Sequence, residues 1–286
     1  MFERRLILVS GKGGVGKSAI TAALAMLAAR RGKRVLALAM LDSSGLAAHL
    51  GVDRLGYQPE RIQPGLFGAA IERSRALDEY LKLQLKVPRA MPTGQLTSAL
   101  NILADTAPGV REIITIGKPI YEVWQDNWDL VVADAPSLGQ LQSYLDAPDT
   151  ITGLVPTGAV QEQAAEMRTT LSDPRISGLT LVSTAEELPV NETTEAIAEI
   201  ESAHRVPIVS VIANRVLDPL DADPEAVAAL RPSPARDAAI LNAGLTASQA
   251  IWLERLPSGP KLPFLFGLHA PVEVAARLSE ECERIA

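Results

Sequence analysis

The stretch that decides the fold is Gly11-Lys12-Gly13-Gly14-Val15-Gly16-Lys17-Ser18, which fits the pattern G-x-x-x-x-G-K-[ST]. An apolar run at residues 5–9 precedes it, and Ile20, Leu24 and Leu27 follow it at helical spacing. Glycines let a strand-to-helix loop curl so that backbone N–H groups point at phosphate oxygens, and the positive end of the helix adds to the attraction. The stretch therefore predicts a phosphate-binding loop. A plain glycine-rich turn is the alternative.

The rest of the chain repeats this alternation of strands and helices. Apolar runs at 34–40, 130–133, 179–182 and 208–213 are typical of strands covered on both faces. Helical patterns occur at 74–86, 93–104, 109–126, 158–172, 190–203, 235–256 and 271–285. Such alternation predicts an α/β fold with a doubly wound, mostly parallel sheet and helices on both faces, as in P-loop nucleotide-binding proteins. No linker-like segment interrupts it, so we expect a single P-loop domain over 1–286, with a mainly helical subregion at about 74–127.

Composition excludes several classes of protein. The 286 residues carry 27 Lys and Arg against 34 Asp and Glu, a net charge of −7, so no nucleic-acid partner is expected. Cys282 is the single cysteine, which rules out a disulfide within one chain and favours the cytoplasm. No apolar stretch approaches the ~18 residues of a membrane span, and we expect neither a signal peptide nor direct membrane insertion.

The loop itself indicates the chemistry. Lys17 is placed to neutralise the β- and γ-phosphates, and Ser18 to bind magnesium. ATP and Mg²⁺ are therefore the expected cofactors. The residues expected to contact the nucleotide from the loop are Gly11, Gly13, Gly14, Val15, Gly16, Lys17, Ser18 and Ala19.

Two acidic residues follow predicted strands, where a parallel sheet places its ligand site. Asp42 can face the phosphate loop and orient an attacking water, or it can cap a short helix at 43–50. Asp134 can hold the magnesium shell, and Gly139 would leave the loop after it free to move. Ser18, Asp42 and Asp134 are the expected metal-site residues.

Residues 12–18 also resemble a known group of proteins, because a second lysine, Lys12, lies inside the loop. They are similar to the deviant Walker A motif of dimeric ATPases that include ParA-like partitioning and septum-positioning proteins, nitrogenase iron protein, the arsenite-pump ATPase (ArsA) and its relatives that target tail-anchored membrane proteins. The resemblance implies that Lys12 reaches the nucleotide of a partner subunit, and that Lys12, Lys17 and Asp42 are catalytic. A solvated loop lysine is the alternative for Lys12.

The resemblance also assigns Asn214, which lies where these ATPases recognise adenine. An asparagine amide offers both a donor and an acceptor, which suits the edge of that base. Asparagine at the end of a strand also favours a turn, and this alternative stays open.

Other stretches resemble the arsenite-pump branch. They are Pro108-Gly109-Val110-Arg111-Glu112 ahead of residues 128–132, and Glu187-Leu188-Pro189-Val190-Asn191-Glu192-Thr193. Residues 42–45 read Asp-Ser-Ser-Gly where that branch usually reads Asp-Pro-Ala-His, and the Cys-x-x-Cys zinc clasp of the targeting ATPases is absent.

The resemblance implies a Mg-dependent ATPase of the ArsA and protein-targeting family that closes as a dimer around nucleotide and acts on a client, which could be a protein. The dimer would be a homodimer or a heterodimer with a related ATPase subunit. Two other readings are a weakly hydrolysing, nucleotide-binding subunit of a heterodimer and a ParA-like partitioning ATPase. An apolar helical set could serve the client or belong to the core: Leu83, Leu85, Met91, Leu96, Leu100, Ile102 and Leu103. The isolated His49, His204 and His269 indicate no metal triad.

Overall fold

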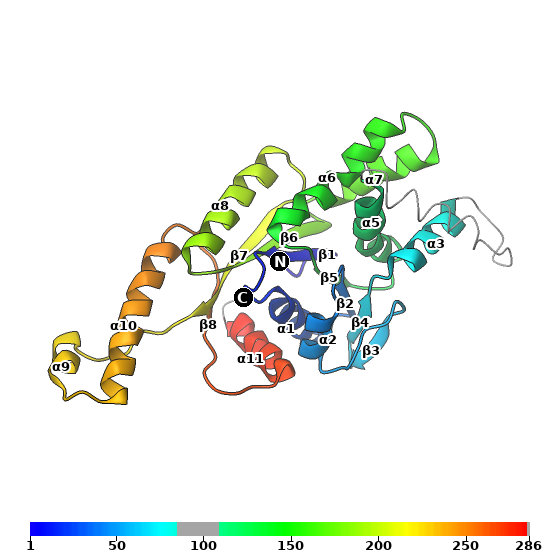
Figure 1. The fold of residues 1–286 in the computed structure, drawn as a ribbon. Helices are drawn as coiled ribbons and strands as arrows, with labels where there is room; N and C mark the ends of the chain where they lie inside the picture. Colours follow the sequence, from blue (N-terminus) through cyan, green and yellow to red (C-terminus); the bar gives the residue numbers. More distant parts are fainter. Residues whose placement is uncertain (85–108, 285–286) are drawn as a thin grey trace.

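A single eight-stranded sheet forms the centre of the chain (Figure 1). The computed structural model describes residues 1–84 and 109–284. The strands run in the spatial order β3-β4-β2-β5-β1-β6-β7-β8, and every neighbouring pair is parallel except β3 with β4. The strands are β1 (Leu6–Gly11), β2 (Val35–Ala39), β3 (Glu60–Gln63), β4 (Leu66–Ala70), β5 (Leu130–Asp134), β6 (Ser177–Thr184), β7 (Ile208–Val216) and β8 (Lys261–Pro263). This confirms the expected α/β class.

Helices cover both faces of the sheet (Figure 1). One apolar core gathers α1, α2 and α11 on one face, and the other gathers α5, α6, α7 and α8 on the opposite face. The helices are α1 (Lys17–Arg30), α2 (Ser44–Leu50), α3 (Arg73–Gln84), α5 (Val110–Trp124), α6 (Leu138–Leu154), α7 (Ala159–Ser172), α8 (Glu187–Ser202), α9 (Pro224–Ala229), α10 (Pro234–Leu253) and α11 (Pro271–Arg284).

The helix after the phosphate loop is enclosed on all sides. Every residue of α1 from Ala19 to Ala29 is buried, because the sheet lies on one side of it and α2 and α11 on the others. Its alanine-rich sequence suits this place, since a helix that is apolar all round belongs in a core. α1 therefore fixes the phosphate loop firmly to the sheet.

A buried ion network joins α3 to α5 on the other face. Lys118 is 6% exposed, and its ammonium contacts Glu79 at 2.7 Å and Glu122 at 2.9 Å. The Trp128 indole donates to Glu122 at 2.8 Å, and Tyr57 donates to Glu79. A paired cation at this depth holds its neighbours in one arrangement, because losing either carboxylate would leave a buried charge unsatisfied.

The sequence patterns missed several elements. They include β3, β4, β8 and α9, as well as α6, whose first turn contains Gly139. The expectation that Gly139 frees a loop is therefore wrong: the chain turns into a helix directly after Asp134 and Pro136. The helix expected at 93–104 lies outside the described residues, as do Leu85, Met91, Leu96, Leu100, Ile102 and Leu103.

The single cysteine, Cys282, lies buried on α11, and burial raises the pKa of its thiol to about 11. In the portion of the chain that the structure covers, none of the helices combines the length and the apolar character needed to cross a membrane.

Candidate nucleotide site

The loop from Gly11 to Ser18 connects β1 with α1 at the carboxyl edge of the sheet. Gly16 adopts a left-handed conformation (φ 98°) as the residue before the first turn of α1. A Cβ atom at this position would lie 2.5 Å from Nδ2 of Asn214. Only glycine fits both conditions, since it carries no Cβ and accepts positive φ. Gly16, the glycine before Lys17 in the motif, is thus required by packing as well as by backbone conformation.

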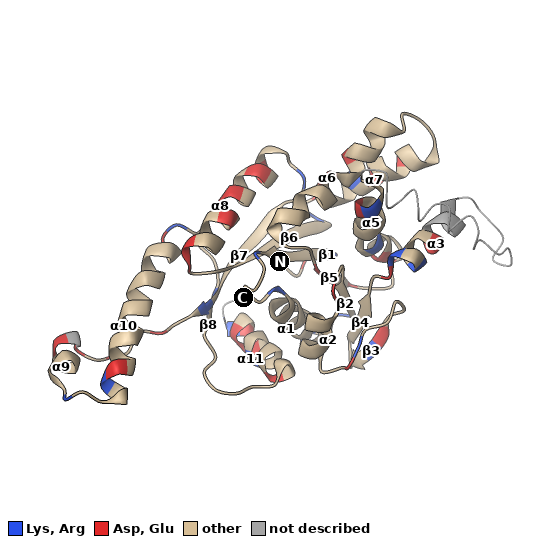
Figure 2. Cartoon of the chain, viewed as in Figure 1, with Lys and Arg blue, Asp and Glu red and all other residues tan. Residues whose placement is uncertain are grey.

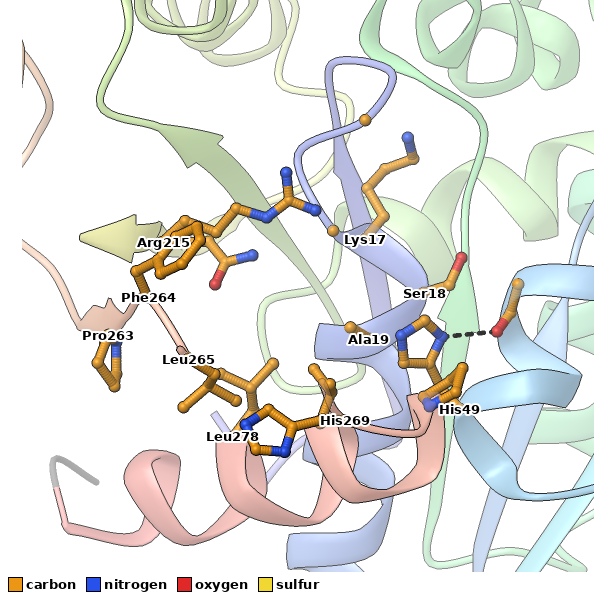
Figure 3. A pocket seen from close by; sticks show the side chains of 16 residues that line it. Lys17, Ser18, Ala19, His49, Arg215, Pro263, Phe264, Leu265, His269 and Leu278 are labelled. Atoms are coloured by element: carbon orange, nitrogen blue, oxygen red, sulfur yellow. Dashed lines mark hydrogen bonds between the residues drawn. The ribbon is translucent and has the colours of Figure 1, made fainter. Parts of the chain in front are cut away.

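Lys17 extends alongside the loop from the start of α1 (Figure 3). Its Nζ donates to the backbone oxygen of Lys12 at 3.2 Å. Burial lowers the pKa of Lys17, and the nearby Asp134 carboxylate opposes this shift. The ammonium therefore lies against the backbone of the loop that the sequence predicts to surround phosphate.

Ser18 and Asp134 are brought together from residues far apart in the sequence. The Ser18 hydroxyl donates to Oδ2 of Asp134 at 2.6 Å. Asp134 ends β5 and is 7% exposed. Burial raises the pKa of its carboxyl to about 6, although the Ser18 hydrogen bond and the Lys17 charge lower it. Its Oδ1 is buried without a hydrogen-bond partner in the described parts of the chain.

This pair fits a small divalent cation. A buried carboxylate oxygen with no partner is costly, and a cation would satisfy it. Magnesium takes oxygen ligands and usually binds through one or two protein groups together with substrate phosphates. Across residues 1–84 and 109–284, no group of three or more His, Cys, Asp or Glu side chains could hold a metal alone. The Ser18 and Asp134 oxygens therefore match magnesium held jointly with a nucleotide.

Asp42 lies on the surface and bonds its own loop. Its carboxylate accepts from the Ser44 backbone N–H at 3.1 Å and from the Ser44 hydroxyl at 2.6 Å. These bonds lower the pKa of Asp42. Asp42 precedes Ser43, which is the N-cap residue of α2, so it does not take the capping position that the alternative expected. Asp42 also does not line the cavity at the start of α1.

Residues 42–45 read Asp-Ser-Ser-Gly and end in Gly45, where the arsenite-pump branch usually has histidine. A Cβ atom on Gly45 would lie 2.9 Å from the Ser18 hydroxyl oxygen. Glycine here lets α2 approach the proposed metal-site serine closely, because it adds no side chain at the contact. Residue 45 therefore belongs to the surroundings of Ser18.

Asn214 joins β7 to the phosphate loop. Its side chain is 3% exposed, and Nδ2 donates to the backbone oxygen of Val15 at 2.8 Å. The residue lies within β7, which extends to Val216, so it does not form a turn at the point where the sequence patterns ended the strand. One amide N–H is committed to the loop while the residue also lines the cavity.

A cavity of about 560 Å³ opens along the start of α1 (Figure 3). This volume is in the usual range for small-molecule sites. Of the predicted residues, Gly14, Gly16, Lys17, Ser18, Ala19 and Asn214 line it. Lining residues that the sequence reasoning missed include Arg215, Pro263, Phe264, Leu265, His49 and His269.

The missed residues gave little signal in the sequence. Arg215 follows Asn214 directly and has an unusual left-handed backbone (φ 59°), while Phe264 follows a strand of only three residues. His49 bonds the Gly45 oxygen through Nδ1 at 2.7 Å, and His269 bonds the Phe266 oxygen through Nε2 at 2.7 Å. The two histidines are distant in sequence yet line the same cavity (Figure 3).

Lys12 makes an ion pair within its own chain. Its ammonium contacts the carboxylate of Glu192, on the second turn of α8. The two side chains are 27% and 34% exposed. Glu192 belongs to the stretch that resembles the arsenite-pump branch, but nothing in the sequence indicated Lys12 as its partner.

The fold and the loop together define the class. A glycine-rich loop between a parallel strand and a buried helix, with a serine bonded to a strand-end aspartate, is the arrangement of a P-loop nucleotide-binding protein. More specifically, the chain belongs to the anion-transporting ATPase family, whose model matches residues 4–157 and 154–233.

Named relatives agree with this assignment. The chain is 31% identical over 300 residues to ATPase BagA of Mycobacterium tuberculosis H37Rv, covering 98% of this chain and 82% of the relative. It is 23% identical over 258 residues to ATPase get3 of Schizosaccharomyces japonicus, covering 78% of each. It is also 29% identical over 144 residues to ATPase ASNA1 homolog 1 of Paramecium tetraurelia, covering 50% of this chain and 43% of the relative.

Proposed function

We propose that this chain is a Mg-dependent ATPase that works as a dimer, with nucleotide closing the dimer and hydrolysis reopening it. The observation that carries the proposal is the hydrogen bond from Ser18, which lines the cavity together with Lys17, to the buried carboxylate of Asp134. Membership of an ATPase family supports it. We further propose that residues 1–286 act as one ATPase domain, because one sheet contains strands from both ends of the described chain.

Each residue has a role in this proposal. The loop from Gly11 to Ala19 binds the triphosphate through backbone N–H groups, and Lys17 neutralises its terminal charges. Ser18 and Asp134 hold the cation, which when bound withdraws charge from the phosphates. Asn214 contacts the adenine, with Arg215 and Phe264 lining the same end of the cavity.

Two residues must move for catalysis. Asp42 has to turn from Ser44 toward the phosphate end of the cavity to orient the attacking water, or to join the metal shell. Lys12 has to leave Glu192 before its ammonium can approach the nucleotide of a second subunit. The Lys12 change would link nucleotide binding to association, because it exchanges a contact within the chain for one at the dimer interface.

The test is steady-state ATPase activity of Lys12→Ala and Asp42→Asn beside the unaltered chain. We expect turnover to fall at least about tenfold in each, as for loss of a group that acts on the transition state. Unchanged turnover in both would refute the mechanism. Size analysis with and without a non-hydrolysable ATP analogue checks the dimer step separately.

A second candidate is a nucleotide-binding subunit that hydrolyses slowly until it pairs with a related chain. The exposed position of Asp42, bonded to Ser44, favours it. Tight nucleotide binding without turnover, followed by activity on mixing with a related ATPase chain, would support this reading. Robust turnover by the chain alone would exclude it.

We propose only the kind of client on which the ATPase acts, which is a protein or an anion. Cys282 is the only cysteine and is buried, so one chain cannot bind arsenite through several thiolates.

A further inference from the structure

Helix α10 has a surface that its own chain does not cover. From Ala238 to Leu253 it has no charged residue, and none of its residues is buried. With α9, it projects from the end of the sheet at β8 (Figure 1), and almost its whole length carries neither acid nor base (Figure 2). An apolar helix is normally covered, and an exposed apolar patch marks a contact surface.

The inner face of α10 is held in place by its own chain. Gln249 accepts from the Leu217 N–H at 2.8 Å and donates to the Arg215 oxygen at 3.1 Å. Asn242 accepts from the Leu220 N–H and donates to the Asp218 oxygen, both at 3.2 Å. These amides fix the rotation of the helix about its axis, so the opposite face is presented to solvent in a defined orientation.

That outer face carries a regular seam. Its positions are separated by four, three, four, three and four residues, the spacing by which two helices interlock. All six are exposed: Asp237, Leu241, Gly244, Ser248, Ile251 and Arg255. Leu241 and Ile251 are each 62% exposed. The space around a Cβ atom on Gly244 is open, and Ser248 is also small, so a second helix can approach closely at the centre.

The two ends of the seam have opposite charges, and each has a neighbour in its own chain: the Asp237 carboxylate lies 3.6 Å from the Arg236 guanidinium, and the Arg255 guanidinium lies over the Trp252 ring. Asp237 and Arg255 are eighteen residues apart by number, or about five helical turns, and therefore lie on one stripe. The backbone stays helical through Glu254 (φ −65°, ψ −22°), which continues the stripe to Arg255. An identical helix running in the opposite direction would place its Arg255 against Asp237 and its Ile251 against Leu241. Its Ser248 would meet Gly244.

We propose that a second copy of this chain packs antiparallel against the outer face of α10, related by a two-fold axis. Such a contact is self-complementary: each pair occurs twice, as two-fold symmetry requires. The charge pattern selects a second copy over a membrane surface, which attracts helices with Lys and Arg along the polar face. In a chain of net charge −7, the uncharged middle of α10 also lets two copies approach without mutual repulsion.

This contact is separate from the nucleotide-driven dimer. No α10 residue lines the nucleotide cavity within the described chain, so the α10 pair needs no ATP. The helix is about 30 Å long, and a single helix pair falls below the roughly 1,200 Å² of a standard interface. The dimer should therefore dissociate in the micromolar range.

The test is sedimentation velocity of the full chain without nucleotide, at concentrations from about 1 to about 200 µM. We expect reversible association from 30.4 kDa toward twice that mass. Asp237→Arg and Arg255→Asp should each weaken association at least about tenfold, because each creates two like-charge contacts. Mixing the two variants should restore a dimer, since a D237R chain and an R255D chain then form both ion pairs. Asp221→Arg, exposed before α9, is the matched control.

Three results of this experiment would overturn the proposal: the chain stays monomeric at every concentration, the dimer is unaffected by both charge reversals, or the two variants fail to associate when mixed. A monomer that floats with anionic phosphatidylglycerol vesicles would identify a lipid surface instead. Association only with an ATP analogue would refute the α10 pair and leave the proposed ATPase mechanism intact. Circular dichroism melting of each variant confirms folding.

Discussion

The ammonium of Lys12 forms an ion pair with the carboxylate of Glu192, 180 positions further along the same chain. The pair joins the phosphate loop to α8 across the nucleotide edge of the sheet. In the proposed mechanism this contact competes with the dimer, because one ammonium cannot satisfy Glu192 and a partner's phosphate together.

Removing Glu192 should therefore release Lys12 for catalysis. Partly exposed ion pairs contribute about 0.2–1 kcal/mol, so Glu192→Ala is expected to raise ATP turnover by about 1.4-fold to fivefold. Steady-state kinetics at several protein concentrations measure the effect. Glu195→Ala, exposed on the same helix, should leave turnover unchanged. A fall in turnover with Glu192→Ala would mean that Glu192 positions Lys12 productively.

Gly16→Ala should lose nucleotide affinity as well as stability. The new Cβ would meet Nδ2 of Asn214 at 2.5 Å, in addition to the roughly 1–2 kcal/mol cost of positive φ. Gly32→Ala is the matched control, because Gly32 also has positive φ (84°) but has no atom near its Cβ position. Thermal unfolding and a fluorescent ATP titration should show the larger loss for Gly16→Ala, and equal losses would contradict the contact with Asn214.

Asp134 should make stability depend on pH in a defined direction. Folding raises its pKa from 3.8 to about 6, so the folded chain binds this proton more tightly than the unfolded chain does. Its contribution favours folding most below pH 4 and is lost as pH rises to about 6. The loss is about 3 kcal/mol at 1.36 kcal/mol per pKa unit.

This pH dependence is tested by measuring the free energy of unfolding of the chain and of Asp134→Asn in the presence of a chelator. The stability of the chain relative to Asp134→Asn should fall between about pH 4 and pH 6 and stay level above that range. MgATP should raise the melting temperature of the chain at pH 7.5 and leave that of the variant nearly unchanged. If the stability of the two proteins changed with pH in the same way, the Asp134 carboxyl would not be the source of the pH dependence.

Lys118→Met should destabilise the chain by about 3 kcal/mol, because Glu122 would be left buried without its cation. Chemical denaturation measures this. Adding Glu122→Gln should recover part of the loss, since a neutral amide can still accept from Trp128. Lys261→Met, on the exposed start of β8, should change stability little. A loss as large for Lys261→Met would argue against the ion network.

The parts of the fold that could be predicted were those with a strong local pattern. β1, the loop and α1 combine a buried apolar run, glycines and an alanine-rich helix, and each signal agrees with the others. α6 was missed because Gly139, Pro148 and Gly153 interrupt its pattern, yet the core face of the sheet holds it helical. β3 was missed since it is a four-residue edge strand with little burial.

The candidate site was predictable only where a motif marked it. Lys17, Ser18 and Asp134 follow from the loop and from a strand end, and the structure brings them together. Glu192 and Phe264 come from distant segments, and no rule of spacing connects them with residues 11–18. Their positions follow from the order of strands in the sheet, which depends on packing along the whole chain.

The burial of Cys282 has a practical consequence for following this molecule in solution. A thiol with a pKa near 11 that solvent scarcely reaches reacts slowly with maleimides. A cysteine engineered at Ser248 or Glu195 would then be the one fast-reacting thiol, so a single fluorophore could be attached to α10 or α8 without first deleting the native residue. Energy transfer between labelled copies would report separately on approach at each helix.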